Sequence, residues 1–536
     1  MQALKIQKFY VRIRYIFATD LNTMETRKVR VRFAPSPTGP LHMGGVRTAL
    51  YNYLFAKHHG GDFILRIEDT DQERFVPGAE EYIIEALKWC GVVPNEGVGF
   101  GDGPYAPYRQ SERKPMYRQY ADQLVNSGHA YYAFDTTEEL GEMRKRIEAA
   151  GGTSSYNAIT RQNMKNSLTL SEDEVKSRIA AGEHYVIRMK IPRNEEIRVK
   201  DLIRGWVVVH SGQMDDKVLF KSDGMPTYHL ANVVDDYTMK ITHVIRGEEW
   251  LPSAPLHVLL YRSFGWEDVM PEFAHLPLLL RPDGNGKLSK RDGDRLGFPV
   301  FPISGNLLDV KTQKPESFTG YRESGYFPDA FINMLALLGW HSSGNQELYT
   351  MEELVKDFSL DRVSKSGAKF DPEKTKWFNQ QYLKKRSDAE LAAIWMKDLD
   401  SKGIKASEDY VLKAVHLVRE KAVFATELHG LGHFLFTAPD TYDAEVIKKR
   451  WNEKSALFMS ALKEAFSVLS TFSAAEAEAC FKQVAEANGI KTGEVMQLFR
   501  VCLSGAAGGP ALFEMAELLG KEETVKRLEA ALNRIK

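Results

Sequence analysis

The sequence predicts an α/β domain, built on a parallel sheet split into two halves, followed by all-helical domains. Three observations predict this arrangement. Strand and helix patterns alternate in residues 28–90, the alternation returns in residues 217–264, and from about residue 387 the chain is dominated by Ala, Leu, Glu and Lys. Alternating strands and helices indicate βαβ units, whereas a run of strong helix formers indicates helices.

The first half of the sheet begins at residues 29–34, where apolar side chains recur with the two-residue period of a strand with two unlike faces. Prolines and a glycine at 35–40 end this strand, and apolar positions at helical spacing follow through residues 46–59. Residues 63–67 are mostly apolar, as in a buried parallel strand. A helical pattern then covers residues 82–90, so the order is β, α, β, α.

The second half of the sheet begins near residue 217. Strand patterns at 217–221 and 241–246 flank a further patterned stretch at 228–234, and a helical pattern covers 256–264. Residues 112–212 have a mixed pattern and many charges. We therefore expect residues 112–212 to be inserted between the two halves.

The C-terminal part of the chain has the composition of helices. Only Pro439 and Pro510 of the 22 prolines lie beyond residue 387, and proline disrupts helix interiors. A chain of 536 residues exceeds one compact core, so we expect about three to five structural units.

Charge and cysteine content limit the possible classes of protein. The 71 basic and 72 acidic side chains leave a net charge of −1, so a polyanion would need a local basic face. Cys90, Cys480 and Cys502 lie outside any CxxC spacing, which argues against a disulfide framework or a thiolate metal site and indicates a reducing compartment. No run of about eighteen apolar residues is present, which excludes an ordinary membrane-spanning helix.

The N-terminal segment differs in composition from the rest of the chain. Residues 1–23 carry several basic side chains and no acid before Asp20, a composition that weakly resembles an organellar transit peptide. Met24 offers a second start just before the first strand. We prefer an upstream extension over a transit peptide.

A glycine-rich turn containing His42 follows the first predicted strand. Its sequence from residue 39 is Gly-Pro-Leu-His-Met-Gly-Gly. Ligands of open parallel sheets bind at the carboxyl ends of strands, and glycines let phosphate oxygens approach backbone N–H groups where a helix starts. Alone, however, such a sequence is more often only a turn.

A second segment, Lys287-Leu288-Ser289-Lys290-Arg291, is bracketed by glycines and predicts an exposed loop. Its cations suit a triphosphate. Taken alone, such a charge run is usually a solvated surface.

Together the two segments resemble the two signatures of class I aminoacyl-tRNA synthetases. Other segments resemble the motifs of bacterial-type glutamyl-tRNA synthetases: Arg32–Gly39, Gly45–Leu50, Arg66–Asp71, Pro107–Arg113, Tyr228–Asp236 and Ile245–Trp250. The resemblance extends from Lys28 to the C-terminus and implies a Rossmann-like catalytic domain. It divides the chain into an N-terminal extension (1–27), the first half of the catalytic domain (28–111), an inserted acceptor-end-binding domain (112–212), the second half with the lysine loop (213–291), a stem-contact domain (292–386) and a helical anticodon-binding domain (387–536).

A glutamate substrate has two carboxylates and one ammonium, so its pocket needs cations and an acid. Arg32 and Arg246, at predicted strand ends, suit the carboxylates, and Glu68 suits the ammonium. By resemblance, the glutamate site also contains Ala34, Ser36, Tyr228 and Asn232. Arg66 and Asp69 are interpreted as an ordinary surface pair.

The resemblance also implies an ATP site. Its residues are Gly39, His42, Gly44, Gly45, Glu249, Leu279, Lys287, Ser289 and Lys290, of which His42, Lys287 and Lys290 are the expected catalytic residues. Mg²⁺ is expected with ATP, where donors and metal stabilise charge that grows on the phosphate oxygens. Some relatives hold zinc, but no cysteine lies between Cys90 and Cys480, so no zinc is expected.

The implied activity is ATP-dependent ligation of L-glutamate to the 3′-terminal adenosine of tRNA(Glu), by a cytoplasmic monomer. The helical C-terminal part disfavours a glutaminyl-tRNA synthetase, whose anticodon-binding part is built from strands. A small-molecule adenylyltransferase of the same superfamily and a non-enzymatic RNA-binding paralogue are also compatible with parts of the sequence. The segment at residues 296–320 is longer than usual for the family. A surface insertion is the preferred interpretation, and the alternative is that the segment orders the lysine loop.

Overall fold

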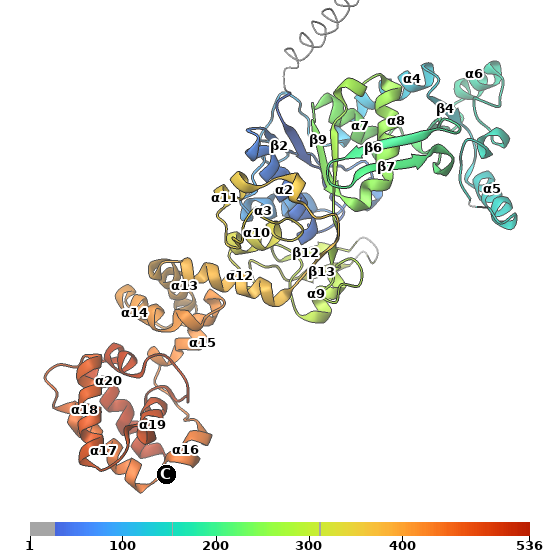
Figure 1. Ribbon diagram of the computed structural model, residues 1–536. Coiled ribbons are helices and arrows are strands. Elements are labelled where there is room, and N and C mark those ends of the chain that lie inside the picture. The colour runs from blue at the N-terminus through green and yellow to red at the C-terminus, as the bar shows by residue number, and fades with distance from the viewer. Residues whose placement is uncertain (1–26, 153, 310–311, 313, 536) are drawn as a thin grey trace, which may run out of the picture. The chain divides into compact units, whose positions relative to one another are not determined.

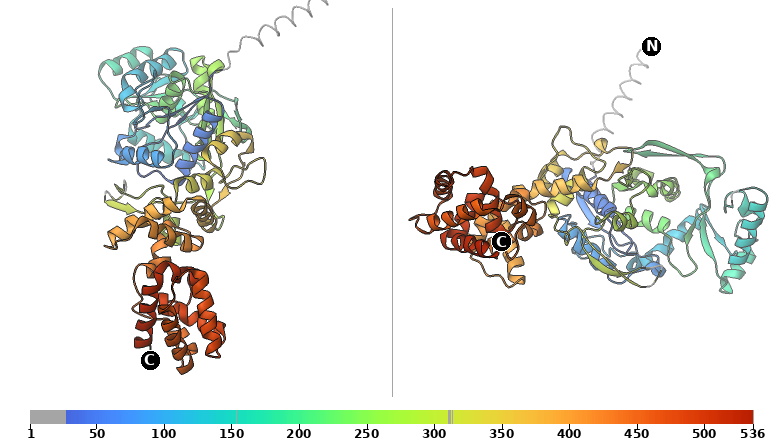
Figure 2. Two further views of the ribbon diagram at one scale, coloured as in Figure 1. Left: turned by 90° about the vertical axis from the view of Figure 1, so that its left-hand side faces the viewer. Right: turned by 90° about the horizontal axis from the view of Figure 1, so that it is seen from below.

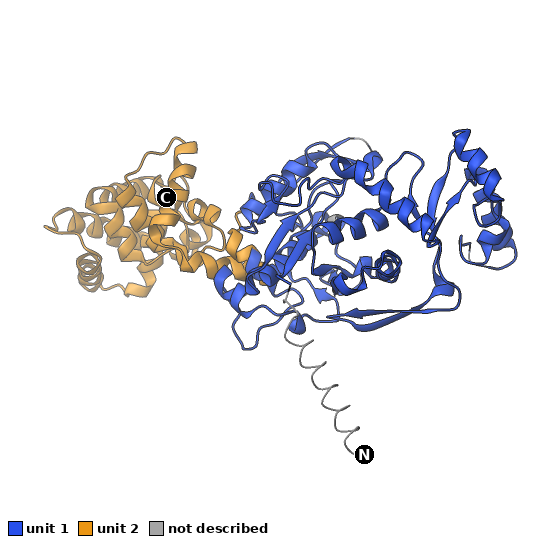
Figure 3. Ribbon diagram, turned by 90° about the horizontal axis from the view of Figure 1, so that it is seen from above, with its two compact units in different colours: residues 1–324, 332–371 blue, residues 325–331, 372–536 orange. Residues whose placement is uncertain are grey.

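The computed structural model describes residues 27–152, 154–309, 312 and 314–535. The chain forms two compact units (Figure 3). Unit 1 comprises the residues up to Ser324 together with Ile332–Asp371, and unit 2 comprises Gly325–Phe331 and the residues from Pro372 onward. The prediction about residues 1–23 lies outside the described residues.

Unit 1 contains the first half of the predicted sheet. Its three parallel strands are β1 (Arg30–Phe33), β2 (Asp62–Leu65) and β3 (Glu96–Gly97), in the order β1-β2-β3. Helices α2 (Met43–His58) and α3 (Ala79–Trp89) connect them, as predicted. The prediction of two unlike faces for β1 is wrong in one respect, because all four of its residues are buried; its arginines are buried together with carboxylates.

The second half of the sheet has the strand order β7-β6-β10-β9. Its strands are β6 (Glu196–Asp201), β7 (Gly205–His210), β9 (His243–Gly247) and β10 (Glu272–Leu276), with β9, β10 and β6 parallel to one another. Helices α7 (Tyr228–Thr238) and α8 (Ala254–Phe264) accompany it (Figure 1). The two halves meet at β1, where the N–H of Thr242 donates to the carbonyl of Arg30 (2.8 Å). The split α/β sheet is therefore confirmed.

A third, antiparallel sheet has the order β4-β5-β8. Its elements are β4 (Ala130–Ala133), β5 (Val186–Met189) and β8 (Val218–Phe220), with helices α4 (Lys114–Asn126), α5 (Thr137–Ala149) and α6 (Glu172–Ala180). The expectation that residues 217–221 belong to the parallel sheet is wrong, because β8 pairs antiparallel with β5. Conversely, β6 and β7 come from the predicted insertion, yet β6 pairs with β10 and β7 pairs with β6. The division into six segments stays a prediction.

The lysine segment forms a small hairpin rather than a free loop. Its first arm is β11 (Leu279–Leu280), which pairs with β14 (Ala368–Lys369), and the N–H of Leu288 donates back to the carbonyl of Leu279 (2.8 Å). The remaining elements here are α9 (Lys290–Leu296), β12 (Gly305–Leu308), β13 (Pro315–Phe318), α10 (Pro328–Ala336) and α11 (Met351–Asp357).

Unit 2 is helical, as predicted, and its helices form bundles (Figure 2). Its helices are α12 (Pro372–Lys385), α13 (Asp388–Ser401), α14 (Glu408–Val418), α15 (Leu428–Gly432), α16 (Ala444–Arg450), α17 (Glu453–Ser467), α18 (Ala474–Ala487), α19 (Thr492–Ser504) and α20 (Leu512–Arg534). Capping boxes fix several helix starts, for example Ser387 with Glu390 and Ser473 with Glu476.

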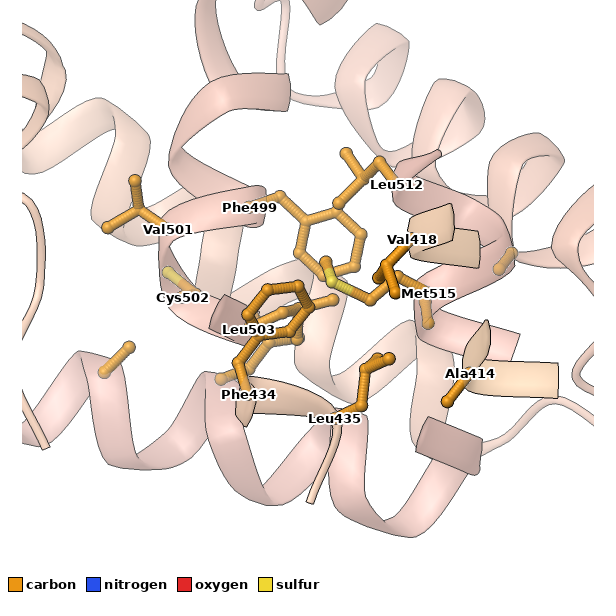
Figure 4. Close-up of a cluster of buried hydrophobic side chains, with 14 of the residues drawn as sticks. Ala414, Val418, Phe434, Leu435, Phe499, Val501, Cys502, Leu503, Leu512 and Met515 are labelled. Atoms are coloured by element: carbon orange, nitrogen blue, oxygen red, sulfur yellow. The ribbon is translucent and has the colours of Figure 1, made fainter. Parts of the chain in front are cut away.

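One apolar core runs through the helices of unit 2. Phe434, Leu435, Phe499, Leu503 and Met515 come from three separate stretches of the chain and pack against one another (Figure 4). Each is at most 4% exposed. Burial of such side chains stabilises the fold by about 1.5–3 kcal/mol each, so this shared core holds the helices of unit 2 together.

Candidate active site

The turn between β1 and α2 is shaped by its glycines and by His42. Gly39 has a φ of 146°, which favours glycine. Gly45 is tightly enclosed, because an added Cβ would lie 2.5 Å from Leu41 Cδ1. His42 is the N-cap of α2, and its Nδ1 accepts a hydrogen bond from the N–H of Gly44 (3.1 Å). The sequence therefore positions this imidazole against the first turn of the helix.

The hydrogen bond to Gly44 fixes the tautomer of His42. Because Nδ1 accepts, the proton of the neutral ring is on Nε2. That Nε2 is buried and has no hydrogen-bond partner among the described residues. Burial, assisted by the nearby charge of Lys287, lowers the pKa of His42 to about 4. At neutral pH the ring is thus an uncharged N–H donor with its donor unused.

The lysine hairpin lies next to this turn. A Cβ added to Gly44 would lie 3.8 Å from Leu279 Cδ1, and the charge of Lys287 acts on His42. Lys287 Nζ forms an ion pair with Glu249 Oε1 at 3.0 Å. The two signature segments, about 240 residues apart in sequence, are therefore neighbours in the fold.

Ser289 and Lys290 of the lysine segment lie at the start of α9. The hydroxyl of Ser289 donates to Asp292 Oδ2 (2.6 Å) in a capping box that starts this helix. In this conformation Ser289 thus serves the helix rather than a ligand. Lys290 is the first residue of α9, but its side chain lies outside the described part of the structure.

A pocket of about 370 Å³ opens at the carboxyl ends of β1 and β9. All seven residues predicted for glutamate line it: Arg32, Ala34, Ser36, Glu68, Tyr228, Asn232 and Arg246. Gly44, Gly45 and Glu249 of the predicted ATP site line the same pocket. The remaining predicted ATP residues do not line it: Gly39 and His42 line a second pocket of about 460 Å³, whereas Leu279, Lys287 and Ser289 line neither.

The second pocket is walled partly by the segment at 296–320. Phe301 is only 5% exposed and contacts the His42 ring edge-on, with centroids 5.9 Å apart. The carbonyl of Val300 accepts from the N–H of Met43 at the start of α2 (2.8 Å), and Leu307 and Phe318 line the pocket. The expected surface position is therefore wrong for Val300 and Phe301, which are buried against the turn; that the segment is an insertion is not contradicted.

A buried network of charges forms the floor of the first pocket. Arg32 donates twice to Asp236, at 3.0 and 3.3 Å, and Arg66 donates to the same carboxylate at 2.7 Å. Arg66 also donates to Glu68 Oε1 (2.9 Å), which accepts from Asn232 as well (3.0 Å). Burial alone would raise the pKa of Asp236, but the two arginines hold it below its usual range. Arg32 and Glu68 are thus fixed in place before substrate arrives.

The interpretation of Arg66 and Asp69 as a surface pair is wrong. Arg66 is 0% and Asp69 8% exposed. Arg66 is bound by Asp236 and Glu68, and Asp69 accepts from the N–H of Ser111 (2.8 Å). Sequence reasoning missed this because the main partner, Asp236, lies 170 residues away.

Arg246 is held differently from Arg32. Its three hydrogen bonds run from Nη1 to the Tyr228 hydroxyl (2.7 Å), from Nη2 to the Trp250 carbonyl (3.3 Å) and from Nε to His275 Nε2 (3.0 Å). None of these partners is a carboxylate. Burial lowers the pKa of Arg246 from its ordinary value, so its buried charge is only weakly compensated within the described residues.

The site also contains side chains that sequence reasoning did not single out. Asp236, His275 and Trp250 contact predicted pocket residues. A usable signal existed for Asp236 and Trp250, which lie in the motif segments Tyr228–Asp236 and Ile245–Trp250, whereas none existed for His275. No group of three or more His, Cys, Asp or Glu able to hold a metal ion occurs in the described ranges.

Comparisons with known proteins agree with this geometry. The model of the family described as tRNA synthetases class I (E and Q), catalytic domain, matches residues 28–299 and 311–377, and an anticodon binding domain matches residues 386–532. The catalytic model leaves residues 300–310 unmatched, within the segment expected to be an insertion.

Individual relatives are similar over nearly the whole chain. A glutamate–tRNA ligase of Cytophaga hutchinsonii is 56% identical over 509 residues, covering 94% of this chain and 97% of the relative. That of Parabacteroides distasonis is 57% identical over 514 residues, covering 96% and 100%. A solved glutamate tRNA ligase from Elizabethkingia meningosepticum, in complex with its amino acid, is 51% identical with a TM-score of 0.91 and covers 95% and 100%. The chain therefore belongs to the class I tRNA synthetases, in the family of the glutamate–tRNA ligases.

Proposed function

We propose that the chain activates L-glutamate with ATP and transfers it to the 3′-terminal adenosine of tRNA(Glu), releasing AMP and pyrophosphate. One observation carries the proposal: the residues expected for glutamate line one pocket, beside the two signature segments expected for ATP. The family membership of the chain supports it independently.

The pocket suits an amino acid with an acidic side chain. Arg246 has neutral hydrogen-bond partners, so a substrate carboxylate can supply the missing counter-charge through charge-assisted hydrogen bonds. Arg32 already shares the carboxylate of Asp236 with Arg66. It is therefore expected to bind a substrate carboxylate less strongly than Arg246 does. Glu68 is the acid available for the substrate ammonium. A pocket whose arginine binds the side-chain carboxylate of glutamate can reject glutamine, which has no charge there, without a separate editing step.

The chemistry proposed needs no protein nucleophile. The substrate carboxylate attacks the α-phosphorus of ATP, pyrophosphate leaves, and an adenosine hydroxyl of the tRNA then attacks the mixed anhydride and releases AMP. The protein positions the reactants and stabilises charge on the phosphate oxygens. His42, as a neutral Nε2–H donor, and Lys287 and Lys290, as cations, are the residues proposed for this task. Glu249 must release Lys287 when the triphosphate binds.

Mg²⁺ belongs to the proposal as part of the MgATP substrate. The described residues offer no cluster of metal ligands, so the triphosphate itself would supply most of its oxygen ligands.

The remaining partner is tRNA. The match of residues 386–532 to an anticodon binding domain supports anticodon contact by unit 2, and the inserted segment at 112–212 is proposed to hold the acceptor end. Of the helices in the described residues, none combines the length and apolarity needed to cross a bilayer. The three cysteines are free and buried. A cytoplasmic monomer remains part of the proposal.

Aminoacylation with labelled glutamate tests the proposal. Purified tRNA(Glu) should be charged with glutamate, and labelled glutamine should not be incorporated. Charging with glutamine instead would favour a glutaminyl-tRNA synthetase. ATP–pyrophosphate exchange that depends on a small-molecule acceptor other than an amino acid, and that needs no tRNA, would favour a small-molecule adenylyltransferase. Binding of tRNA without charging would favour an RNA-binding paralogue. A parallel reaction with tRNA(Gln) measures whether both tRNAs are substrates.

A further inference from the structure

A chain of two buried hydrogen bonds leads from Arg246 away from the pocket. Arg246 Nε donates to His275 Nε2 at 3.0 Å, and His275 Nδ1 lies 2.6 Å from Asp201 Oδ2. The three side chains are 5%, 0% and 2% exposed. His275 lies on β10 and Asp201 ends β6, so the chain crosses from one strand to its parallel neighbour.

The direction of both hydrogen bonds is fixed. An arginine Nε–H can only donate, so His275 Nε2 must accept and the ring proton must be on Nδ1, where it donates to Asp201. Burial lowers the pKa of His275, although the hydrogen bond to Asp201 opposes the shift. The imidazole is therefore neutral, in one defined tautomer.

Asp201 is itself held firmly. Its Oδ1 accepts from the N–H groups of Ile203 (3.0 Å) and Arg204 (2.8 Å), and its Oδ2 accepts from the N–H of His275 (3.1 Å). Burial alone would raise the pKa of Asp201, but the hydrogen bonds from His275 and Arg204 outweigh it and hold the pKa below its usual range. An ionised, immobile carboxylate thus faces His275.

We propose that Asp201 and His275 are positioning residues for Arg246. Asp201 selects the His275 tautomer that accepts from Arg246, and this bond orients the guanidinium toward the pocket without neutralising its charge. A carboxylate placed directly on Arg246 would orient it equally well but would cancel the charge that the substrate needs. The neutral imidazole between Asp201 and Arg246 therefore orients the guanidinium and leaves its charge available to the substrate. This inference rests on the proposed function, in which Arg246 binds a glutamate carboxylate.

Asp201→Asn tests the tautomer argument with an isosteric change. The new amide can donate to His275 Nδ1, which shifts the ring proton to Nε2. Two N–H donors, that of His275 Nε2 and that of Arg246 Nε, would then face each other. We expect the KM for glutamate to rise about ten- to a hundredfold, as large as the effect of losing a partner that orients a metal-binding histidine. The KM for ATP should stay within about twofold, because Arg246 does not face the lysine hairpin in this proposal.

His275→Gln is the conservative variant, because an amide can accept from Arg246 and donate to Asp201 at the same time. It should keep the KM for glutamate within a few-fold of wild type, whereas His275→Leu should behave like Asp201→Asn. Adding Asp201→Asn to His275→Leu should change the KM no further, since Asp201 acts only through the imidazole.

Asp216→Asn is the matched control. Asp216 is 0% exposed and lies in the same unit, but it binds Arg161 and Tyr131 instead of a pocket residue. It should lower the Tm without a selective change in the KM for glutamate. A wild-type KM in Asp201→Asn, or an equal rise in both KM values, would overturn the inference. If the wild-type protein does not charge glutamate at all, the proposed function has failed instead.

The wild-type protein offers a test whose readout is the tautomer of His275 itself rather than a KM. With ¹⁵N-labelled histidine, the His275 signals are identified by their loss in His275→Gln or His275→Leu. Nε2 should show the chemical shift of an unprotonated ring nitrogen at neutral pH. A protonated Nε2 would contradict the proposed orientation.

Discussion

Lys287 Nζ lies 3.0 Å from Glu249 Oε1, so a cation of the lysine segment is paired with an acid at the rim of the amino-acid pocket. Both side chains are about half exposed, and such exposed pairs contribute only about 0–1 kcal/mol. The carboxylate of Glu249 therefore binds Lys287 only weakly, and a triphosphate can displace it at little energetic cost.

Lys287→Ala should cripple adenylate formation and leave the fold intact. Loss of one well-aimed donor costs about 2.7–4 kcal/mol of transition-state stabilisation, or about 10²–10³ in kcat. Glutamate-dependent ATP–pyrophosphate exchange in the presence of tRNA measures the rate, and a thermal melt checks the fold. The same loss is expected for Lys290→Ala. Near-normal exchange by either variant would remove that lysine from the mechanism.

His42→Ala should lose activity of similar size, because the buried Nε2–H has no other partner in the described chain and is available to a phosphate oxygen. His42→Gln places an amide donor near the same point and should recover part of the loss. Since burial lowers the pKa of His42 to about 4, its protonation should not contribute to the acid limb of kcat above about pH 5. A limb near pH 6.5 that disappears in His42→Gln would contradict this assignment.

Arg246→Gln should raise the KM for glutamate by at least about thirtyfold, because removing one partner of a buried charge pair costs about 2–5 kcal/mol. Arg246→Lys should recover only part of the loss, since lysine cannot reproduce the fork that contacts Tyr228, Trp250 and His275 together. Steady-state exchange with varied glutamate gives both values. A KM for glutamate close to the wild-type value in both variants would show that Arg32, rather than Arg246, binds the substrate carboxylate.

Asp236→Asn should destabilise unit 1 by about 3–5 kcal/mol, because it leaves Arg32 and Arg66 buried without their shared carboxylate. Urea unfolding followed by tryptophan fluorescence measures the change. Glu172→Gln removes an exposed pair with Lys176 in the same unit and should leave the unfolding curve unchanged. Equal curves for the two variants would mean that the buried network contributes nothing to folding.

Stability should decrease on mild acidification. Burial lowers the pKa of both His42 and His229 to about 4 from 6.5, so between these values the unfolded chain binds more protons than the folded one. Their contribution to stability is therefore complete above about pH 6.5 and declines as the pH falls toward about 4, by at most about 1.4 kcal/mol per pH unit for each histidine. Urea midpoints at several pH values, compared with His229→Asn, check this. The variant should show the shallower pH dependence, and identical slopes would contradict the prediction.

Much of the fold could be predicted from local patterns in the sequence, whereas most of the pocket lining was implied by the resemblance to a known family. The β1 turn with His42 has its glycines and its helix start in one short stretch, and the helical texture after residue 387 needs no tertiary information. The pairing of strands could not be predicted in this way. β8 has the same local pattern as a parallel strand, and only its partner β5 makes it antiparallel.

The acids behind the pocket could not be predicted for the same reason. Asp201 looks locally like an ordinary charged residue, and the segment around Asp236 does not show which residue it pairs with. Their burial depends on partners far along the chain, His275 and Arg66. A charged side chain is stable in the interior only when folding brings an oppositely charged partner next to it. The sequence alone does not show which residues will be paired.

The pairing of β6 with β10 has a consequence for how this molecule can be altered. The segment from 112 to 212 cannot be removed without altering the sheet, because it contributes β6, the strand next to the one that carries His275. Excising the whole segment, or grafting a relative's version with a different β6, would uncover the flank of β10 and remove the carboxylate beneath His275. Chimaeras built at residue 195 instead, upstream of β6, should keep the amino-acid pocket intact.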